Sequence, residues 1–260
     1  MIRTVTATRY MTPLREGGSL PAIIQADDGR VYVLKFRGAG QGRKALIAEL
    51  VVGEIGRALG LRVPEIVLVE VDPELGRAEP DPEIQELIQA SAGLNLALAY
   101  LPSALGFDPA QRATIEPALA SMIVWFDAYM TNVDRTARNT NMLLWQQQLW
   151  LIDHGAALYV HYTWTDYLAR SRSRFPQVKD HVLLPAASAL GEADAMLRSR
   201  LSPALIEQII GLIPDSWLAA PPSFTTFAEH RAAYTSYLRS RLESTSGFLE
   251  EALNARAQLV

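Results

Sequence analysis

The chain of 260 residues contains no cysteine, so it has neither a disulfide framework nor a thiolate metal site. This is compatible with a reducing compartment, and we expect a cytoplasmic protein. No apolar run approaches the ~20 residues that span a bilayer, so no membrane span is expected. The first residues lack the pattern of a secretion signal, so secretion is not indicated. The net charge is −4, and no basic stripe is present, which argues against tight nucleic-acid binding.

Apolar residues, in contrast, are plentiful: 49% of the sequence is hydrophobic, enough to bury a substantial core. The length suits one large domain or two small ones that share a cleft. An Asp-Gly turn signal between two β-rich stretches predicts an early hairpin over residues 22–36. The other expected elements are helices over 43–59, 83–90 and 117–130 and from 203 and 225, strands over 66–71 and 94–101, a surface loop over 72–83 and a linker over 102–106.

The densest group of polar residues flanks two short apolar runs near the middle of the chain. These runs, 142–145 and 149–152, predict a hairpin whose two ends lie on the same side. Such a hairpin would bring Asp134, Asn139 and Asp153 together. Two carboxylates and an amide oxygen are hard ligands that suit Mg²⁺, which also keeps water and phosphate ligands. An Asp, four residues, an Asn and a later Asp-x-Gly is also the spacing of a kinase catalytic loop and its metal-binding triplet.

A lysine interrupts the apolar face of the second early strand. With a period of two, Lys35 shares a face with Val31 and Val33, and a buried ammonium must be paired. Its functional role would be to hold nucleotide phosphate oxygens, whereas the structural alternative is an edge-strand lysine that reaches solvent. Glu54 lies within the apolar stripe of the next helix and Glu49 lies roughly opposite, so helical periodicity favours Glu54 as the partner of Lys35.

Three further features have both a functional and a structural interpretation. The Gly-Gly-Ser loop at 17–19 could let backbone N–H groups approach a phosphate, or it could be a surface turn. The basic segment 170–174 follows the triplet where a substrate-facing segment would lie, but a solvated loop is the favoured interpretation. His154, next to Asp153, could be taken for an acid–base residue, but no serine nucleophile elbow accompanies it.

Together these motifs resemble the HipA-like kinases, bacterial relatives of protein kinases and of phosphatidylinositol 3/4-kinases. The resemblance covers residues 17–157 and rests on Gly-Gly-Ser, V-Y-V-L-K-F, A-E-L-V-V-G-E-I-G-R-A-L-G-L-R-V-P-E, N-V-D-R-T-A-R-N and L-I-D-H-G. It implies an α+β, two-lobed protein-kinase-like fold with a small β-rich N-lobe over 1–101 and a mostly helical C-lobe over 102–260. The triplet departs from the Asp-Phe-Gly of protein kinases by its histidine.

The resemblance also implies roles for individual residues. Asp134 would be the catalytic base, and Glu49, not Glu54, would pair with Lys35, so resemblance and periodicity disagree about this helix. The implied ligand-binding residues are Asn139 and Asp153 for Mg²⁺, Gly17, Gly18, Ser19 and Lys35 for the phosphates, and Ala99, Tyr100 and Leu101 near an adenine-contacting hinge.

The sequence therefore predicts an ATP- and Mg²⁺-dependent kinase that transfers the γ-phosphoryl group to a hydroxyl of a protein or small-molecule acceptor. Two alternatives stay open. One is a nucleotide-binding pseudokinase or regulatory module that keeps ATP as a structural ligand without turnover. The other is a purely structural interaction protein, for which ATP would not be a ligand.

Overall fold

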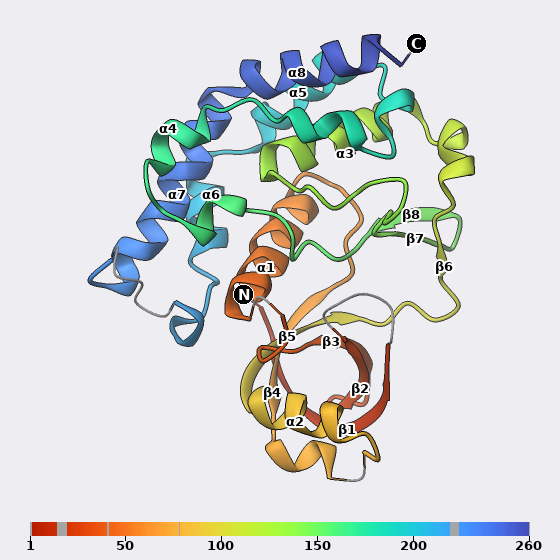
Figure 1. Ribbon diagram of the computed structural model, residues 1–260, viewed down its shortest axis with the longest axis vertical. Helices are drawn as coiled ribbons and strands as arrows, with labels where there is room; N and C mark the ends of the chain where they lie inside the picture. The colour runs from red at the N-terminus through yellow and green to blue at the C-terminus, as the bar shows by residue number, and fades with distance from the viewer. Residues whose placement is uncertain (1, 15–19, 41, 78, 219–223, 260) are drawn as a thin grey trace.

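The computed structural model describes residues 2–14, 20–40, 42–77, 79–218 and 224–259. A closed β-barrel lies at one end and a helical part at the other, with helix α1 (Arg43–Ala58) between them (Figure 1). The strands are β1 (Thr4–Pro13), β2 (Ala22–Ala26), β3 (Val31–Lys35), β4 (Ile66–Val71), β5 (Gly93–Ala99), β6 (Leu105–Gly106), β7 (Met142–Trp145) and β8 (Gln148–Leu151). The other α-helices are α2 (Pro82–Ala90), α3 (Pro117–Met130), α4 (Tyr167–Ser171), α5 (Leu190–Arg200), α6 (Pro203–Ile210), α7 (Phe227–Glu243) and α8 (Thr245–Ala257). Short 3-10 helices are η1 (Pro73–Gly76), η2 (Pro109–Thr114), η3 (Tyr159–Tyr162), η4 (Pro176–Asp180), η5 (Leu184–Ala186) and η6 (Asp215–Trp217).

The barrel has the strand order β1-β2-β3-β5-β4 and is closed by parallel pairing of β1 with β4. Its interior follows from the alternation of side chains along each strand. Tyr32 and Leu34 of β3 are fully buried inside, where they join Ile24 of β2 and Val69 of β4. Closure removes the free strand edges that an open sheet of this size would expose.

The predicted early hairpin is confirmed as β2 and β3, whereas strand β1 was not predicted. In β1 only Val5 and Ala7 are buried, so the sequence carries too short an apolar alternation to indicate a strand of this length. The surface loop predicted over 72–83 also contains η1 and the first two residues of α2. Asp72 and Asp81 each accept the backbone N–H two residues further on, which caps these helices.

The central hairpin is present as β7 and β8. Its turn consists of Gln146 and Gln147, with φ values of +49° and +58°. Positive φ at both central positions is typical of the type I′ turn, whose twist matches that of the flanking strands. The turn is therefore a tight two-residue turn, although it lacks the usual Asn-Gly signal. Strand β6 pairs with β7, so part of the predicted linker 102–106 is fixed to this hairpin.

The helical part is organised around α3, which packs against α5 and α8. Trp125 of α3 stacks on Tyr129 with ring centroids 5.2 Å apart and donates its indole N–H to Asp194 at 2.8 Å. The buried Arg241 of α7 donates to the backbone oxygens of Tyr129 (2.8 Å) and Ser171 (3.0 Å). These contacts fix the C-terminal end of α3, from which the loop that carries Asp134 starts.

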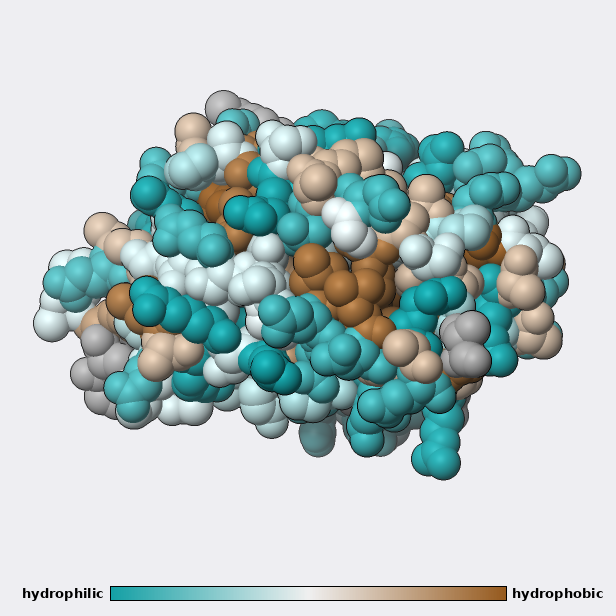
Figure 2. Space-filling view, turned by 90° about the horizontal axis from the view of Figure 1, so that it is seen from above, coloured by the Kyte–Doolittle hydropathy of each residue, from teal (hydrophilic) through white to brown (hydrophobic). Residues whose placement is uncertain are grey.

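The surface of the helical end is mainly hydrophilic, with a group of apolar residues near the centre of the face seen from above (Figure 2). Large hydrophobic side chains that are exposed singly, such as Leu253 on α8, are ordinary for a protein surface. Within the ranges that the structure describes, none of the helices combines the length and the apolar character needed to cross a membrane.

Candidate active site

The candidate site is assembled around the Lys35 ammonium at the end of β3. Because Tyr32 and Leu34 fill the barrel, Lys35 projects from the opposite face of the strand, where α1 packs. Its Nζ lies 2.8 Å from Oδ1 of Asp153 and 3.2 Å from Oε1 of Glu49. Burial alone would lower the pKa of Lys35, but the charges of Glu49 and Asp153 raise it, so the amine stays charged at neutral pH.

The partner of Lys35 on α1 is Glu49, so the prediction from helical periodicity was wrong. Glu54 instead forms an ion pair with Arg57 at 3.3 Å. Periodicity failed because ten residues of α1 are buried, on almost every side of the helix. Strands β4 and β5, helix α6 and the short helix η6 all pack against it. An apolar stripe therefore does not identify the face that meets the lysine.

Glu49 holds both the lysine and the turn that follows β8. While Oε1 faces Lys35, Oε2 accepts the backbone N–H of His154 at 3.0 Å. Burial raises the pKa of Glu49 to about 7, opposed by the charge of Lys35 and assisted by the carboxylate of Asp153. Burial acts on Asp153 in the same direction, but Lys35 keeps the pKa of Asp153 below its ordinary value. Two carboxylates thus compete for one ammonium, and Asp153 is the more firmly ionised.

Asp153 reaches Lys35 from a backbone conformation that few residues adopt. Its φ is +55°, a left-handed value at which aspartate is enriched among residues other than glycine. Just before it, the N–H of Ile152 donates to the backbone oxygen of Asn141 at 3.0 Å, which continues the pairing of β7 with β8. The Asp153 side chain remains 40% exposed, so it is accessible to a ligand.

Asp134 lies in the loop between α3 and β7. Thr131, the residue after helix α3, has a left-handed conformation, and the Asn132 side chain then accepts the N–H of Asp134 at 3.2 Å. Oδ2 of Asp134 accepts hydrogen bonds from Nδ2 of Asn139 at 2.8 Å and from Nδ2 of Asn141 at 3.1 Å. The structure therefore brings the predicted pair, Asp134 and Asn139, together.

Asn141 is a site residue that the sequence reasoning missed. Its Nδ2 also lies 3.5 Å from the backbone oxygen of Asp153, so the Asn141 side chain links Asp153 to Asp134. Asn141 is buried, whereas Asn139 is exposed. The sequence feature that could have indicated Asn141 is its position directly before the apolar run of β7, where the chain enters the hairpin.

A buried ion pair that was also not predicted anchors this loop to α3. Nε of Arg135 lies 2.5 Å from Oδ2 of Asp127, and both side chains are fully buried. Asp127 also accepts hydrogen bonds from Asn132 and from His181, each at 2.9 Å. Burial opposes ionisation, but Arg135 and His181 hold the pKa of Asp127 far below its ordinary value. Arg135 further donates to the backbone oxygen of Asn141, so the pair fixes both ends of the loop.

The remaining predicted site residues lie apart from this group or outside the described residues. Gly17, Gly18 and Ser19 belong to a segment that the structure does not describe. The basic segment 170–174 is only partly the solvated loop that was expected. Arg170 and Ser171 end helix α4, with Ser171 buried. Arg172 is exposed, and the exposed Arg174 lies 3.7 Å from Glu251 of α8.

The predicted hinge residues Ala99, Tyr100 and Leu101 line a cavity of about 500 Å³ together with Trp145 and Trp150 of the central hairpin. The lining of this cavity does not include the lysine and the carboxylates described above. A contact between the hinge residues and adenine therefore stays a prediction.

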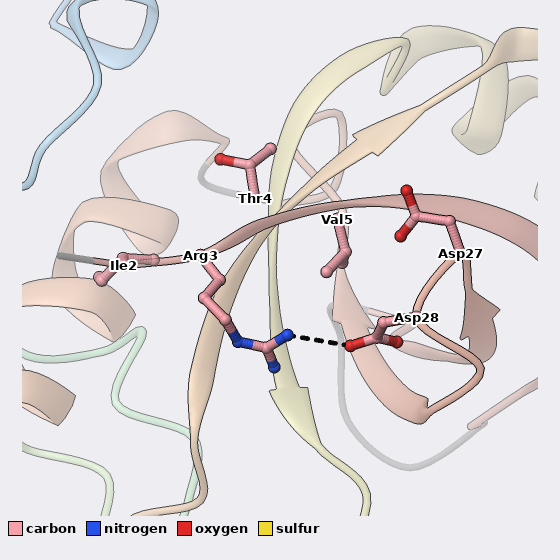
Figure 3. A pocket seen from close by; sticks show the side chains of 6 residues that line it. All are labelled: Ile2, Arg3, Thr4, Val5, Asp27 and Asp28. Carbon is pink, nitrogen blue, oxygen red and sulfur yellow. Dashed lines mark hydrogen bonds and ion pairs between the residues drawn. The ribbon is translucent and has the colours of Figure 1, made fainter.

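A second cavity, of about 750 Å³, lies on the barrel between the start of β1 and the turn from β2 to β3 (Figure 3). There the guanidinium of Arg3 points toward Asp28, and the two groups form an ion pair at 3.1 Å. Asp27 is a second carboxylate in the lining. Because this cavity has two carboxylates and its arginine is already paired, it does not suit a phosphate group.

Comparison with solved structures identifies the fold as that of kinases. A Helicobacter pylori proinflammatory kinase, CtkA, superposes with a TM-score of 0.55 and 15% sequence identity over 99% of each chain. The Golgi casein kinase, in a structure with Mn and ADP bound, gives a TM-score of 0.54 and 12% identity over 96% of this chain and 74% of that one. At such identities the likeness establishes the fold alone.

A sequence model of the HipA-like kinase family matches residues 8–246, and the chain belongs to this family. This confirms the family that the sequence motifs resemble. None of the curated proteins matches the chain. Family membership and the kinase fold together support a kinase-type phosphotransferase.

Proposed function

We propose that this protein is an ATP- and Mg²⁺-dependent kinase that transfers the γ-phosphoryl group to a hydroxyl of a protein or small-molecule acceptor. The observation that carries the proposal is the meeting of barrel and hairpin: Lys35 contacts Asp153 at 2.8 Å. Asn141 then connects Asp153 to Asp134. An ammonium, two carboxylates and an amide in one place are the groups that phosphoryl transfer requires, because its catalysis is mostly positioning and charge neutralisation.

In this proposal the barrel and the helical part are the two lobes of a kinase, residues 1–101 and 102–260. Residues 99–101 form the hinge beside the adenine. The position of α1 between the two parts supports this division, since its Glu49 contacts both the barrel lysine and the His154 backbone (Figure 1).

The donor set fits a magnesium ion that keeps phosphate and water ligands. Within the described ranges no three His, Cys, Asp or Glu side chains form a metal-binding group. Asp153 and one asparagine amide would therefore hold the cation with the phosphates, as Mg²⁺ commonly requires. The bound ion would neutralise charge on the phosphates. Lys35, oriented by Glu49, holds phosphate oxygens, and Asp134 accepts the proton of the acceptor hydroxyl.

Binding of ATP with and without Mg²⁺ tests the proposal. We expect Mg·ATP to raise the melting temperature of the wild type, with about 2.7 kcal/mol of stabilisation at a ligand concentration of 100 times Kd. Asp153→Asn should lose the Mg²⁺-dependent part of this stabilisation, since the substitution removes the carboxylate that would bind the cation. Glu86→Gln, at an exposed position of α2, is the matched control.

The same experiment separates the alternatives when transfer of labelled γ-phosphate is measured alongside. A thermal shift without any labelled product would favour a nucleotide-binding regulatory module. No shift with either form of ATP would contradict the proposal and favour a structural interaction protein.

Separate replacement of the two asparagines identifies the amide ligand. The sequence predicts Asn139. We propose Asn141 instead, because its side chain is buried and its Nδ2 lies 3.5 Å from the backbone oxygen of Asp153. We expect Asn141→Ala to weaken Mg·ATP binding by about 10–100-fold, and Asn139→Ala to weaken it less. Calorimetric titration with Mg·ATP, and with ATP in a chelator as the control, measures both. The reverse order of effects would return the role to Asn139.

A further inference from the structure

His154, the second residue of the Asp-His-Gly triplet, has neither a base nor a ligand role in the proposed function. Its side chain is fully buried. Its backbone N–H donates to Glu49 at 3.0 Å, and its Nδ1 lies 3.3 Å from a terminal nitrogen of Arg135. One residue therefore contacts α1 through its main chain and the Asp134 loop through its side chain.

The contact with Arg135 determines which ring nitrogen carries the proton. A guanidinium can only donate hydrogen bonds, so Nδ1 of His154 must offer its lone pair and the proton must be on Nε2. In the described part of the chain Nε2 has no hydrogen-bond partner. The ring lies edge to face with Phe126 of α3, with centroids 6.1 Å apart and planes at 88°. A proton donor or acceptor that exchanges with a substrate would need access that this ring lacks.

Arg135 is the point where these contacts converge. The same guanidinium that pairs with Asp127 also donates to the backbone oxygen of Asn141 and to Nδ1 of His154. Asn141 lies directly before β7 and His154 lies beyond the end of β8, so one buried cation holds both ends of the hairpin. A phenyl ring at position 154 has no lone pair to accept this hydrogen bond.

We propose that His154 is a positioning residue. Through Arg135 it joins the turn of Asp153 to the loop of Asp134, and so holds the carboxylates of Asp153 and Asp134 in the relative positions that phosphoryl transfer requires. The inference rests on the proposed function for its effect on rate. The hydrogen bond itself does not depend on that function. The effect on rate and the hydrogen bond can therefore be tested separately.

Two substitutions of His154 test the effect on rate. His154→Asn places an amide oxygen where Nδ1 stood and keeps an acceptor for Arg135, whereas His154→Phe removes it. We expect His154→Phe to lower kcat for transfer of labelled γ-phosphate from Mg·ATP by about 10–100-fold with KM for ATP unchanged, and His154→Asn to restore most of the rate. The control is His230→Phe, because His230 is also buried and its ring packs against Phe224, Trp164 and Tyr234.

Three kinetic results would overturn the proposal: wild-type kcat in His154→Phe, equal losses in the Phe and Asn variants, or a rise in KM in place of a fall in kcat. An equal loss of rate in His230→Phe would also overturn it, because any buried histidine would then have the same effect.

Nitrogen NMR of the wild-type imidazole, assigned by comparison with His154→Phe, tests the hydrogen bond independently of turnover. The proton is expected on Nε2, and a proton on Nδ1 would refute the contact. If the wild type transfers no labelled γ-phosphate, the proposed function fails together with the effect on rate. The tautomer then still decides whether His154 accepts from Arg135.

Discussion

Asp134→Asn is expected to lower the rate of phosphoryl transfer by about 10²–10⁴-fold, the usual contribution of a general base, while ATP binding is retained. The substitution keeps the shape of the side chain and leaves an oxygen that can accept from Asn139 and Asn141. It removes the capacity to take a proton from the acceptor hydroxyl. The measurement is transfer of labelled γ-phosphate, together with the thermal shift produced by Mg·ATP.

Retention of binding makes this experiment specific for the catalytic role. Asp153→Asn should lose Mg²⁺-dependent binding, whereas Asp134→Asn should bind Mg·ATP and fail in transfer. Glu86→Gln should behave as the wild type in both assays. Equal transfer rates for Asp134→Asn and the wild type would show that another group, or no base at all, serves the acceptor.

The parts of the site that the sequence predicted lie at the ends of regular elements. Lys35 ends a strand with a clear period of two, and the hairpin of β7 and β8 returns Asp153 to the loop of Asp134 and Asn139. In both cases local alternation and a turn determine where the side chain lies. Prediction from neighbouring residues is sufficient when the geometry is set within one hairpin.

The parts that the sequence did not predict depend on contacts between distant segments. Nothing local to α1 distinguishes Glu49 from Glu54, since the helix is enclosed by the barrel and by α6. Likewise, His181 meets Asp127 across 54 residues of sequence, and His154 meets Arg135 from the far end of the hairpin. Closure of the barrel by pairing of β1 with β4 likewise depends on contacts between segments that are distant in the sequence. These features are determined by tertiary packing, which the periodicity of a sequence does not predict.

The largest expected effect on stability comes from removal of one partner of the buried Arg135–Asp127 pair. Arg135→Met should lower the free energy of unfolding by about 3–5 kcal/mol, because it leaves the Asp127 carboxylate buried with its main cation gone. The double variant Arg135→Met/Asp127→Leu should recover much of this loss, since apolar replacement of both charges is often neutral. Urea denaturation followed by tryptophan fluorescence measures all three proteins.

The matched surface control is the pair formed by Arg231 and Asp215 at 2.6 Å, in which the aspartate side chain is 64% exposed. Asp215→Asn should cost less than about 1 kcal/mol, as exposed ion pairs do. A similarly small loss for Arg135→Met would show that Asp127 finds other compensation, and Arg135 would then not be the anchor of the loop.

The pH dependence of stability should follow from the same pair. Because the folded pKa of Asp127 lies far below its ordinary value, ionised Asp127 contributes stability at every pH above the unfolded pKa of about 4. That contribution is lost as the pH falls below about 4 toward the folded pKa. Arg135→Met raises the folded pKa of Asp127 toward or above its unfolded value, so its stability should decline less steeply on acidification than that of the wild type. Parallel acid titrations of the two proteins would contradict this, and they would mean that His181 and Asn132 hold the carboxylate ionised without Arg135.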